Sequence, residues 1–276
     1  PWVDVELSGS TYSFVLDTGA KFTVLSSGVA DVVSPGWDKR GRRSDLSLRI
    51  RVRNMSIGGK QLPAIKAAVL DGDNFTFRCV GADGILGMDV LGKYTLVFDY
   101  NENAISFYDK KVDEDGLLWW QMATDNGGRP FFKGRLGTGD GQSEETYLFF
   151  DSGNGRDAVI FTEKVAESYL HVLDSLEHAT GFSGINIDGT GSARPIYRGV
   201  LPDLGFGDAG FLNIPVREGH APVPYPLLPA RITLFGRLLL DFPGKRYAYI
   251  PYELKASSWS IPRQRVQTMI ENGRIV

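Results

Sequence analysis

The sequence predicts an all-β fold, mainly β-strands with a few short helices, built as two similar lobes. Runs of β-branched and aromatic residues alternate with turns, and the chain contains 33 glycines and 14 prolines. This pattern is typical of many short strands joined by tight turns. One strand-and-turn motif also occurs twice, and 276 residues leave room for two lobes of ordinary size.

Composition and charge exclude several classes of function. Hydrophobic residues make up 42% and charged residues 23%, the balance of a soluble globular protein. The net charge of −3 favours neither nucleic acid nor an anionic membrane, so we expect neither as a partner. Cys79 is the only cysteine, which excludes an intramolecular disulfide and a cysteine-based metal cluster. His171, His178 and His220 are too scattered for a zinc site, so we expect no metal and no cofactor.

The repeated motif organises the chain. An apolar, β-prone run over residues 11–20 reaches Asp17-Thr-Gly, and a second over residues 146–154 reaches Asp151-Ser-Gly. Each motif is followed by another apolar run and then by a helical pattern. The first helix is expected over residues 27–33. The second begins after Thr162, a good N-cap, and its apolar residues recur at helical spacing: Val165, Tyr169, Leu173 and Leu176.

The two halves also end alike. A segment ending in glycine is followed in each half by a two-stranded hairpin; these segments are 84–87, 95–100 and 104–108 in the first half, and 232–236, 240–242 and 246–250 in the second. Between the landmarks, residues 46–52 alternate apolar with polar, as in a strand with one buried face. We therefore place the first lobe at residues 1–112, the second at 113–254 and a tail at 255–276, with a terminal helix expected over 262–272.

Two aspartates at the ends of buried strands can carry hydrolytic chemistry. Like charges held close together cannot both ionise, so two carboxyl groups share one proton, and one of them can act as base while the other acts as acid. Asp17 and Asp151 are the candidate catalytic residues. The residues after each aspartate are expected to support it through backbone N–H groups, a tight glycine turn and a hydroxyl that links the loops: Thr18, Gly19, Ala20, Ser152, Gly153 and Asn154. The Asn154 amide could also donate to Asp151, so we expect Asp151 to be the more acidic member.

This layout resembles the aspartic proteases, in particular the retropepsin-like branch. The matching residues are Phe14-Val-Leu-Asp-Thr-Gly-Ala20 and Asp83-Gly-Ile-Leu-Gly-Met-Asp89, followed by Leu96-Val-Phe-Asp-Tyr100. Two such halves in one chain look like the bilobal, pepsin-type double β-barrel with one aspartate loop per lobe. The resemblance implies an endopeptidase that activates a water between Asp17 and Asp151 and acts on a peptide or protein substrate.

The second lobe departs from the family pattern. Asn154 stands where such enzymes usually carry Ala, Ser or Thr, and Arg237-Leu238 follow Gly236 where the first lobe has Met88-Asp89. By analogy with Ile85-Leu-Gly87, we expect the segment 234–236 to pass behind the Asp151 loop. The short interval from Gly236 to Asp241 then predicts that a connecting helix is missing.

A lid over a two-aspartate site would exclude water. The first lobe offers the charged loop 36–43, with Trp37 and Gly41 as flap candidates, and the second offers residues 181–191. The basic residues of the first loop could favour acidic substrates or could simply be solvated at a hairpin tip.

The leading hypothesis is therefore an aspartic endopeptidase that works as a monomer. One alternative is a bilobal peptide-binding or interaction module whose catalytic function has decayed. The other is an enzyme whose site forms between two chains, each contributing Asp17. The chain begins in a strand-like pattern, so we expect a leading segment to have been removed and suspect a periplasmic or secreted location.

Overall fold

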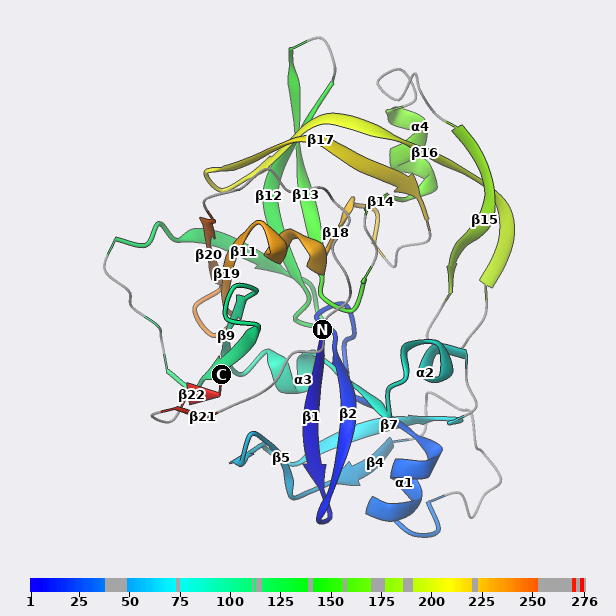
Figure 1. The fold of residues 1–276 in the computed structure, drawn as a ribbon, viewed down its shortest axis with the longest axis vertical. Helices are drawn as coiled ribbons and strands as arrows, with labels where there is room; N and C mark the ends of the chain where they lie inside the picture. The colour runs from blue at the N-terminus through cyan, green and yellow to red at the C-terminus, as the bar shows by residue number, and fades with distance from the viewer. Residues whose placement is uncertain are drawn as a thin grey trace.

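The computed structural model confirms the predicted all-β class and gathers most strands into two large sheets. It describes residues 1–37, 49–72, 75–110, 112, 116–138, 141–155, 158–169, 177–185, 191–219, 223–252, 270–271 and 274–275. In Figure 1 the N-terminal half forms the lower lobe and the C-terminal half forms the upper lobe. The N-terminal strand runs down from the junction between them.

The first lobe is built on an eight-stranded sheet in the order β4-β7-β3-β8-β2-β1-β5-β6. Its strands are β1 (Trp2–Leu7), β2 (Ser10–Leu16), β3 (Val24–Ser26), β4 (Arg49–Val52), β5 (Met55–Ile57), β6 (Lys60–Gln61), β7 (Ile65–Leu70) and β8 (Gly84–Leu86). Its helices are α1 (Ser27–Val33), α2 (Phe75–Val80) and α3 (Met88–Leu91). On β2 the fully buried Phe14 and Leu16 point into the main core, so Val15 and Asp17 lie on the other face of the strand.

The second sheet has twelve strands in the order β10-β9-β19-β20-β11-β12-β13-β18-β14-β17-β16-β15. The strands of the upper lobe are β12 (Pro130–Gly137), β13 (Ser143–Asp151), β14 (Val159–Phe161), β15 (Glu177–Ile185), β16 (Gly191–Phe206), β17 (Ala209–Glu218) and β18 (Leu227–Pro229). Helix α4 (Glu163–Ser168) and the 3₁₀ helix η1 (Ala230–Leu234) pack beside them.

Two hairpins, one from each half of the chain, pair with each other within the twelve-stranded sheet. They are formed by β9 (Thr95–Asp99) with β10 (Ala104–Tyr108), and by β19 (Gly236–Asp241) with β20 (Arg246–Pro251). Strand β9 from the first half pairs antiparallel with β19 from the second, and β20 continues the sheet through β11 (Trp120–Thr124). Both hairpins were predicted from the sequence, but their pairing with each other was not.

The aspartate strands occupy equivalent positions in the two lobes. Strand β2 runs parallel to β8, and strand β13 runs parallel to β18, with Asp151 opposite Pro229. The expectation that residues 234–236 pass behind Asp151 is therefore wrong, because Leu227–Pro229 fills that place. The supposedly missing helix is the short helix η1, which precedes Gly236 rather than following it.

Local sequence signals predicted the first helix and the start of the second correctly, but the predicted terminal helix is wrong at its end. Helix α1 spans the predicted residues, and Thr162 caps α4 by accepting from the Val165 backbone N–H. The rest of the predicted second helix, residues 170–176, lies outside the described residues. The terminal helix expected over 262–272 is wrong at its end, where Ile270–Glu271 forms β21 and pairs with β22 (Arg274–Ile275). Within the described part of the chain, none of the helices has the length and apolar character needed to cross a membrane.

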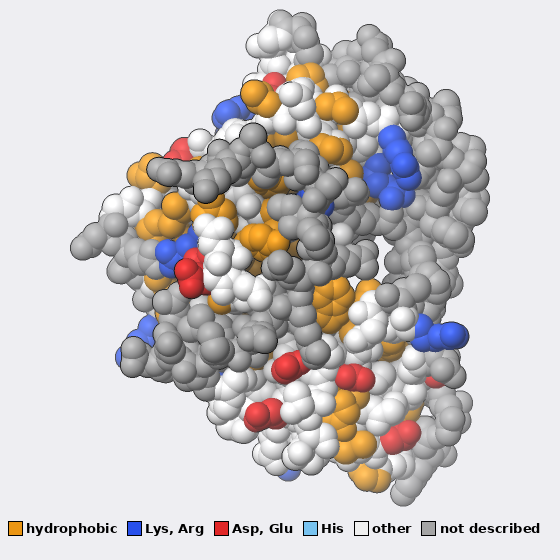
Figure 2. All heavy atoms as spheres, in the orientation of Figure 1, with side chains coloured by type: hydrophobic (Ala, Val, Ile, Leu, Met, Phe, Trp, Pro, Cys, Tyr) orange, Lys and Arg blue, Asp and Glu red, His pale blue; other side chains and the backbone are white. Residues whose placement is uncertain are grey.

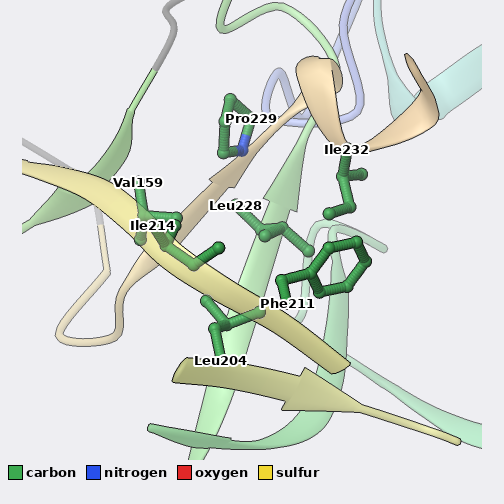
Figure 3. A pocket seen from close by; sticks show the side chains of 7 residues that line it. All are labelled: Val159, Leu204, Phe211, Ile214, Leu228, Pro229 and Ile232. Carbon is green, nitrogen blue, oxygen red and sulfur yellow. The ribbon is translucent and has the colours of Figure 1, made fainter. Parts of the chain in front are cut away.

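A small apolar cavity lies inside the upper lobe. Figure 3 shows side chains from β14, β16, β17, β18 and η1 converging on it: Val159, Leu204, Phe211, Ile214, Leu228, Pro229 and Ile232. Leu228 and Pro229 belong to the strand that supports Asp151 from behind. The cavity is lined by apolar side chains alone, so it is a packing feature of the lobe rather than a site for chemistry.

Candidate active site

Each aspartate is fixed by the loop that follows it. The Asp17 Oδ1 atom accepts hydrogen bonds from the backbone N–H groups of Gly19 (2.7 Å) and Ala20 (3.1 Å). The Asp151 Oδ1 atom accepts the equivalent bonds from Gly153 (3.0 Å) and Asn154 (3.2 Å). The two turns are therefore copies of one another, as the repeated motif predicts.

The residues after the aspartates lock the two loops together. The Thr18 backbone N–H donates to Ser152 Oγ (2.9 Å), and the Ser152 backbone N–H donates to Thr18 Oγ1 (3.0 Å). Thr18 Oγ1 donates to the Phe150 carbonyl (3.0 Å), and Ser152 Oγ donates to the Leu16 carbonyl (2.8 Å). Both side chains are fully buried, so these four bonds are shielded from water and hold the ends of β2 and β13 at a fixed separation.

The lock brings the two carboxyl groups into direct contact. Asp17 and Asp151 share a side-chain hydrogen bond, and both are half-buried. The glycines confirm how tightly the loops meet. A Cβ atom added to Gly19 would lie 2.6 Å from Asp151 Cγ, and one added to Gly153 would lie 2.4 Å from Asp17 Cγ. Side chains other than hydrogen would therefore collide with the opposite carboxyl group.

Burial and proximity perturb both acids. Burial raises the pKa of Asp17 above its usual value, although hydrogen bonds from Asp151 and from the backbone oppose the shift. Burial, followed by the negative charge of Asp17 and their shared hydrogen bond, raises the pKa of Asp151 well above its usual value. Such a pair retains one proton between its two members.

The expected order of acidity stays a prediction. The sequence predicted that Asp151 would be the more acidic member, and in the structure the pKa values of both carboxyl groups are raised. Each carboxylate accepts two backbone N–H bonds from its own loop, so the loops do not distinguish the two acids. At Asp151 the pKa is raised first by burial and then by the charge of Asp17 and their shared hydrogen bond, which the backbone bonds from Asn154 and Gly153 oppose.

Behind the aspartate loops the lobes differ. In the first lobe the Gly87 backbone N–H donates to Thr23 Oγ1 (3.2 Å), and Thr23 donates to Asp89 from both its backbone and its hydroxyl (2.8 Å each). Asp89 thus serves a structural role. Pro229 stands opposite Asp151 in the second lobe and has no N–H to donate. The segment that supports Asp151 is Leu227-Leu-Pro229. It is apolar but ends in proline, whereas the repeat predicted a segment that ends in glycine.

The flap candidates remain predictions. Trp37 packs against the main core, and its indole Nε1 donates to Asp31 of α1 (2.8 Å). Gly41 lies outside the described residues, as do residues 186–190 of the second candidate segment. Among the described side chains, no group of three or more His, Cys, Asp or Glu residues could hold a metal ion.

Comparison with known proteins agrees with this geometry. A family model described as gag-polyprotein putative aspartyl protease matches residues 3–93. The match includes Asp17 with its loop and strand β8, which passes behind it, but it does not extend to Asp151. A search of curated proteins found no match. Over residues 3–93, the first lobe is therefore similar to the aspartyl protease family.

Proposed function

We propose that this protein is an aspartic endopeptidase that cleaves peptide or protein substrates with Asp17 and Asp151 of a single chain. The observation that carries the proposal is the hydrogen bond between the two carboxyl groups, held by loops that interlock through Thr18 and Ser152. Both aspartates come from one polypeptide, which supports a monomer of pepsin-like form built from two retropepsin-like halves. Figure 2 shows a narrow gap between the upper and lower parts of the molecule at its right-hand side.

In this proposal Asp17 is the base and Asp151 is the acid. Ionised Asp17 takes a proton from a water held between the carboxyl groups, and the resulting hydroxide oxygen attacks the scissile carbonyl carbon. Protonated Asp151 gives its proton to the carbonyl oxygen, which yields a neutral tetrahedral diol. Asp17 then passes its proton to the leaving nitrogen while Asp151 takes a proton back from the diol. The C–N bond breaks, and the pair returns to sharing one proton.

The test is proteolysis of a denatured protein substrate at acidic and neutral pH, with and without a statine-type transition-state mimic. We expect cleavage that the mimic inhibits. Asp17→Asn and Asp151→Asn should each lower kcat by at least about 10³-fold, because each removes half of the acid–base pair. Asp208→Asn is the matched control, since it removes an exposed carboxylate at a hairpin tip and should leave activity unchanged.

The same assay distinguishes the alternatives. Binding of the mimic without any hydrolysis would indicate a peptide-binding module. Loss of activity in Asp17→Asn but not in Asp151→Asn would indicate a site formed between two chains. The contact between the Asp17 and Asp151 loops within one chain favours the single-chain enzyme.

A further inference from the structure

The carboxylate of Asp89 closes a ring of hydrogen bonds behind the Asp17 loop. Asp89 is the second residue of α3, and its Oδ1 atom accepts from the backbone N–H and the hydroxyl of Thr23 (2.8 Å each). The Thr23 hydroxyl oxygen accepts in turn from the Gly87 backbone N–H (3.2 Å). Thr23 is fully buried and Asp89 is half-buried, so water competes little for these bonds.

The ring is connected to the carboxyl group of Asp17 through Ala20. The Met88 backbone N–H donates to the Ala20 carbonyl (2.9 Å), and the Ala20 N–H donates to Asp17 Oδ1 (3.1 Å). Residue 20 is therefore bound to the start of α3, and residue 23 is bound to Asp89 on the same helix. The segment 20–23, which supplies one of the N–H donors of Asp17, is thus held at both ends.

The close packing of this region leaves the segment little freedom to shift. A Cβ atom added to Gly87 would lie 2.4 Å from the carbonyl carbon of Phe22, so the two segments pack backbone against backbone. On the other side of the loop, a Cβ atom added to Gly19 would lie 2.6 Å from Asp151 Cγ. Movement of the segment away from α3 would therefore change both the N–H bonds to Asp17 and the contact between the two carboxyl groups.

The second lobe carries a residue of opposite charge at the equivalent place. The Ala230 backbone N–H donates to the Asn154 carbonyl (3.3 Å), which is the counterpart of the bond from Met88 to the first loop. Arg231 follows directly and therefore takes the place of Asp89. A guanidinium has donors but no acceptor, so Arg231 cannot copy the ring. A carboxylate at this place therefore supports only the first of the two aspartate loops.

We propose that Asp89 is a positioning residue for the catalytic pair. It holds Thr23, and with it the segment 20–23, so that Asp17 keeps its backbone donors and its contact with Asp151. Asp89 acts through this segment and not by contact with the substrate. The inference rests on the proposed endopeptidase function and adds a residue to the machinery of that same site.

The test compares Asp89→Ala with Asp89→Asn. Both variants lose the negative charge, but the asparagine keeps an Oδ1 atom that can accept from Thr23. Asp89→Ala should lower kcat by about 10- to 100-fold and change KM by less than about 3-fold, because a displaced Asp17 weakens the transition state more than substrate binding. Asp89→Asn should restore most of the lost kcat. Steady-state kinetics on one peptide measures both values.

The pH profile separates positioning from a loss of stability. Without the bonds to Thr23, the loop N–H groups hold the ionised form of Asp17 less closely, which raises the lower apparent pKa of the pair. The acidic limb of the kcat/KM profile should therefore lie about 0.5 pH unit higher in Asp89→Ala than in Asp89→Asn. The lost charge is common to both variants, so it cancels in this comparison.

Asp241→Ala is the matched control. Asp241 also accepts from a threonine hydroxyl, that of Thr95 (3.3 Å), and from a backbone N–H, that of Gly244 (2.9 Å), but it does so where β9 meets the β19–β20 hairpin. This variant should lower the Tm and leave kcat and the acidic limb unchanged well below that Tm. If Asp89→Ala does not fold, Thr23→Val against Thr23→Ser makes the same comparison, because only serine keeps the hydroxyl.

Equal kcat values and equal acidic limbs in Asp89→Ala and Asp89→Asn would overturn the inference and leave the endopeptidase intact. An equal loss of kcat in Asp241→Ala would also overturn it. If the wild-type protein hydrolyses no peptide, the proposed function fails instead. Titration of the aspartate carboxyl carbons by NMR then still compares the two Asp89 variants. A higher value of the lower apparent pKa in the alanine variant would support the inference, and equal values would refute it.

Discussion

At each aspartate, a glycine faces the carboxyl group that belongs to the other lobe. Gly19 lies against Asp151 and Gly153 lies against Asp17, each too close to admit a methyl group. The sequence predicted that these glycines would allow sharp turns. The structure adds a second reason for them, since they leave room for the two carboxyl groups to meet.

Gly153→Ala should therefore reduce activity by about 100-fold or more, because the new Cβ would displace Asp17 from its partner. Gly155→Ala is the matched control. It adds the same methyl group two residues further along, where nothing lies within 4 Å, and should leave kcat/KM nearly unchanged. Steady-state kinetics on one peptide would compare the two variants, and equal activities would contradict the close contact.

The raised pKa of Asp151 predicts how stability depends on pH. A raised folded-state pKa means that the folded protein binds the proton more tightly than the unfolded chain does. Its contribution is complete below the ordinary aspartate pKa of about 4 and is lost as the pH rises through the folded-state value. The Tm of the wild-type protein should therefore fall relative to that of Asp151→Asn as the pH rises from about 4, and activity should decline over the same range. Calorimetry of both proteins across pH checks this, and parallel Tm profiles would count against a shared proton.

At the scale of elements, the ends of β2 and β13 are joined by hydroxyl groups rather than by apolar packing. Ser152 Oγ both accepts from the Thr18 N–H and donates to the Leu16 carbonyl. Ser152→Ala would leave both of these buried groups without a partner and should lower the free energy of unfolding by about 2–4 kcal/mol. Ser152→Thr keeps a hydroxyl, as in the first lobe, and should restore most of the loss. Denaturant unfolding of the three proteins measures the difference, and an equally stable alanine variant would exclude the lock as a stabilising element.

Local pattern predicted the elements that depend on local chemistry. The two aspartate turns, helix α1, the Thr162 cap and both closing hairpins could be read from turn residues and periodicity. Strand β18 could not, because Leu227–Pro229 is only three residues long and is a strand through its pairing with β13 and β14. The prediction looked for the glycine that ends the equivalent segment of the first repeat, and it therefore chose the segment ending in Gly236 instead. The sequence also could not predict which carboxyl group holds the shared proton, because this depends on the distance between the two groups and not on the residues beside them.

For the whole molecule, the pairing of β9 with β19 connects the two halves of the chain. Strands β9 and β19 pair through Leu239 and Val97, and these residues pack with Ala248 on one side of the sheet. Trp119 covers that side, where Arg246 stacks on its ring at 4.0 Å.

Leu239→Ala should lower the free energy of unfolding by about 2–5 kcal/mol, since Leu239 is fully buried between the hairpins. We expect the variant to unfold in one transition, seen together by tryptophan fluorescence and far-UV circular dichroism. Two separate transitions would show that the lobes are independent.

The pairing of β9 with β19 also determines the order in which parts of the structure can form during synthesis. Thr95 and Asp241, which meet in this sheet, are separated by 146 positions along the chain. On a ribosome, the first hairpin emerges long before its partner has been translated, and so must wait with an open edge. Asp17 likewise lacks its counterpart until Asp151 has been added and folded. On the proposed function, newly synthesised molecules would gain hydrolytic chemistry only after the chain has been translated and folded beyond Asp151, a delay that would protect a nascent protease from digesting itself.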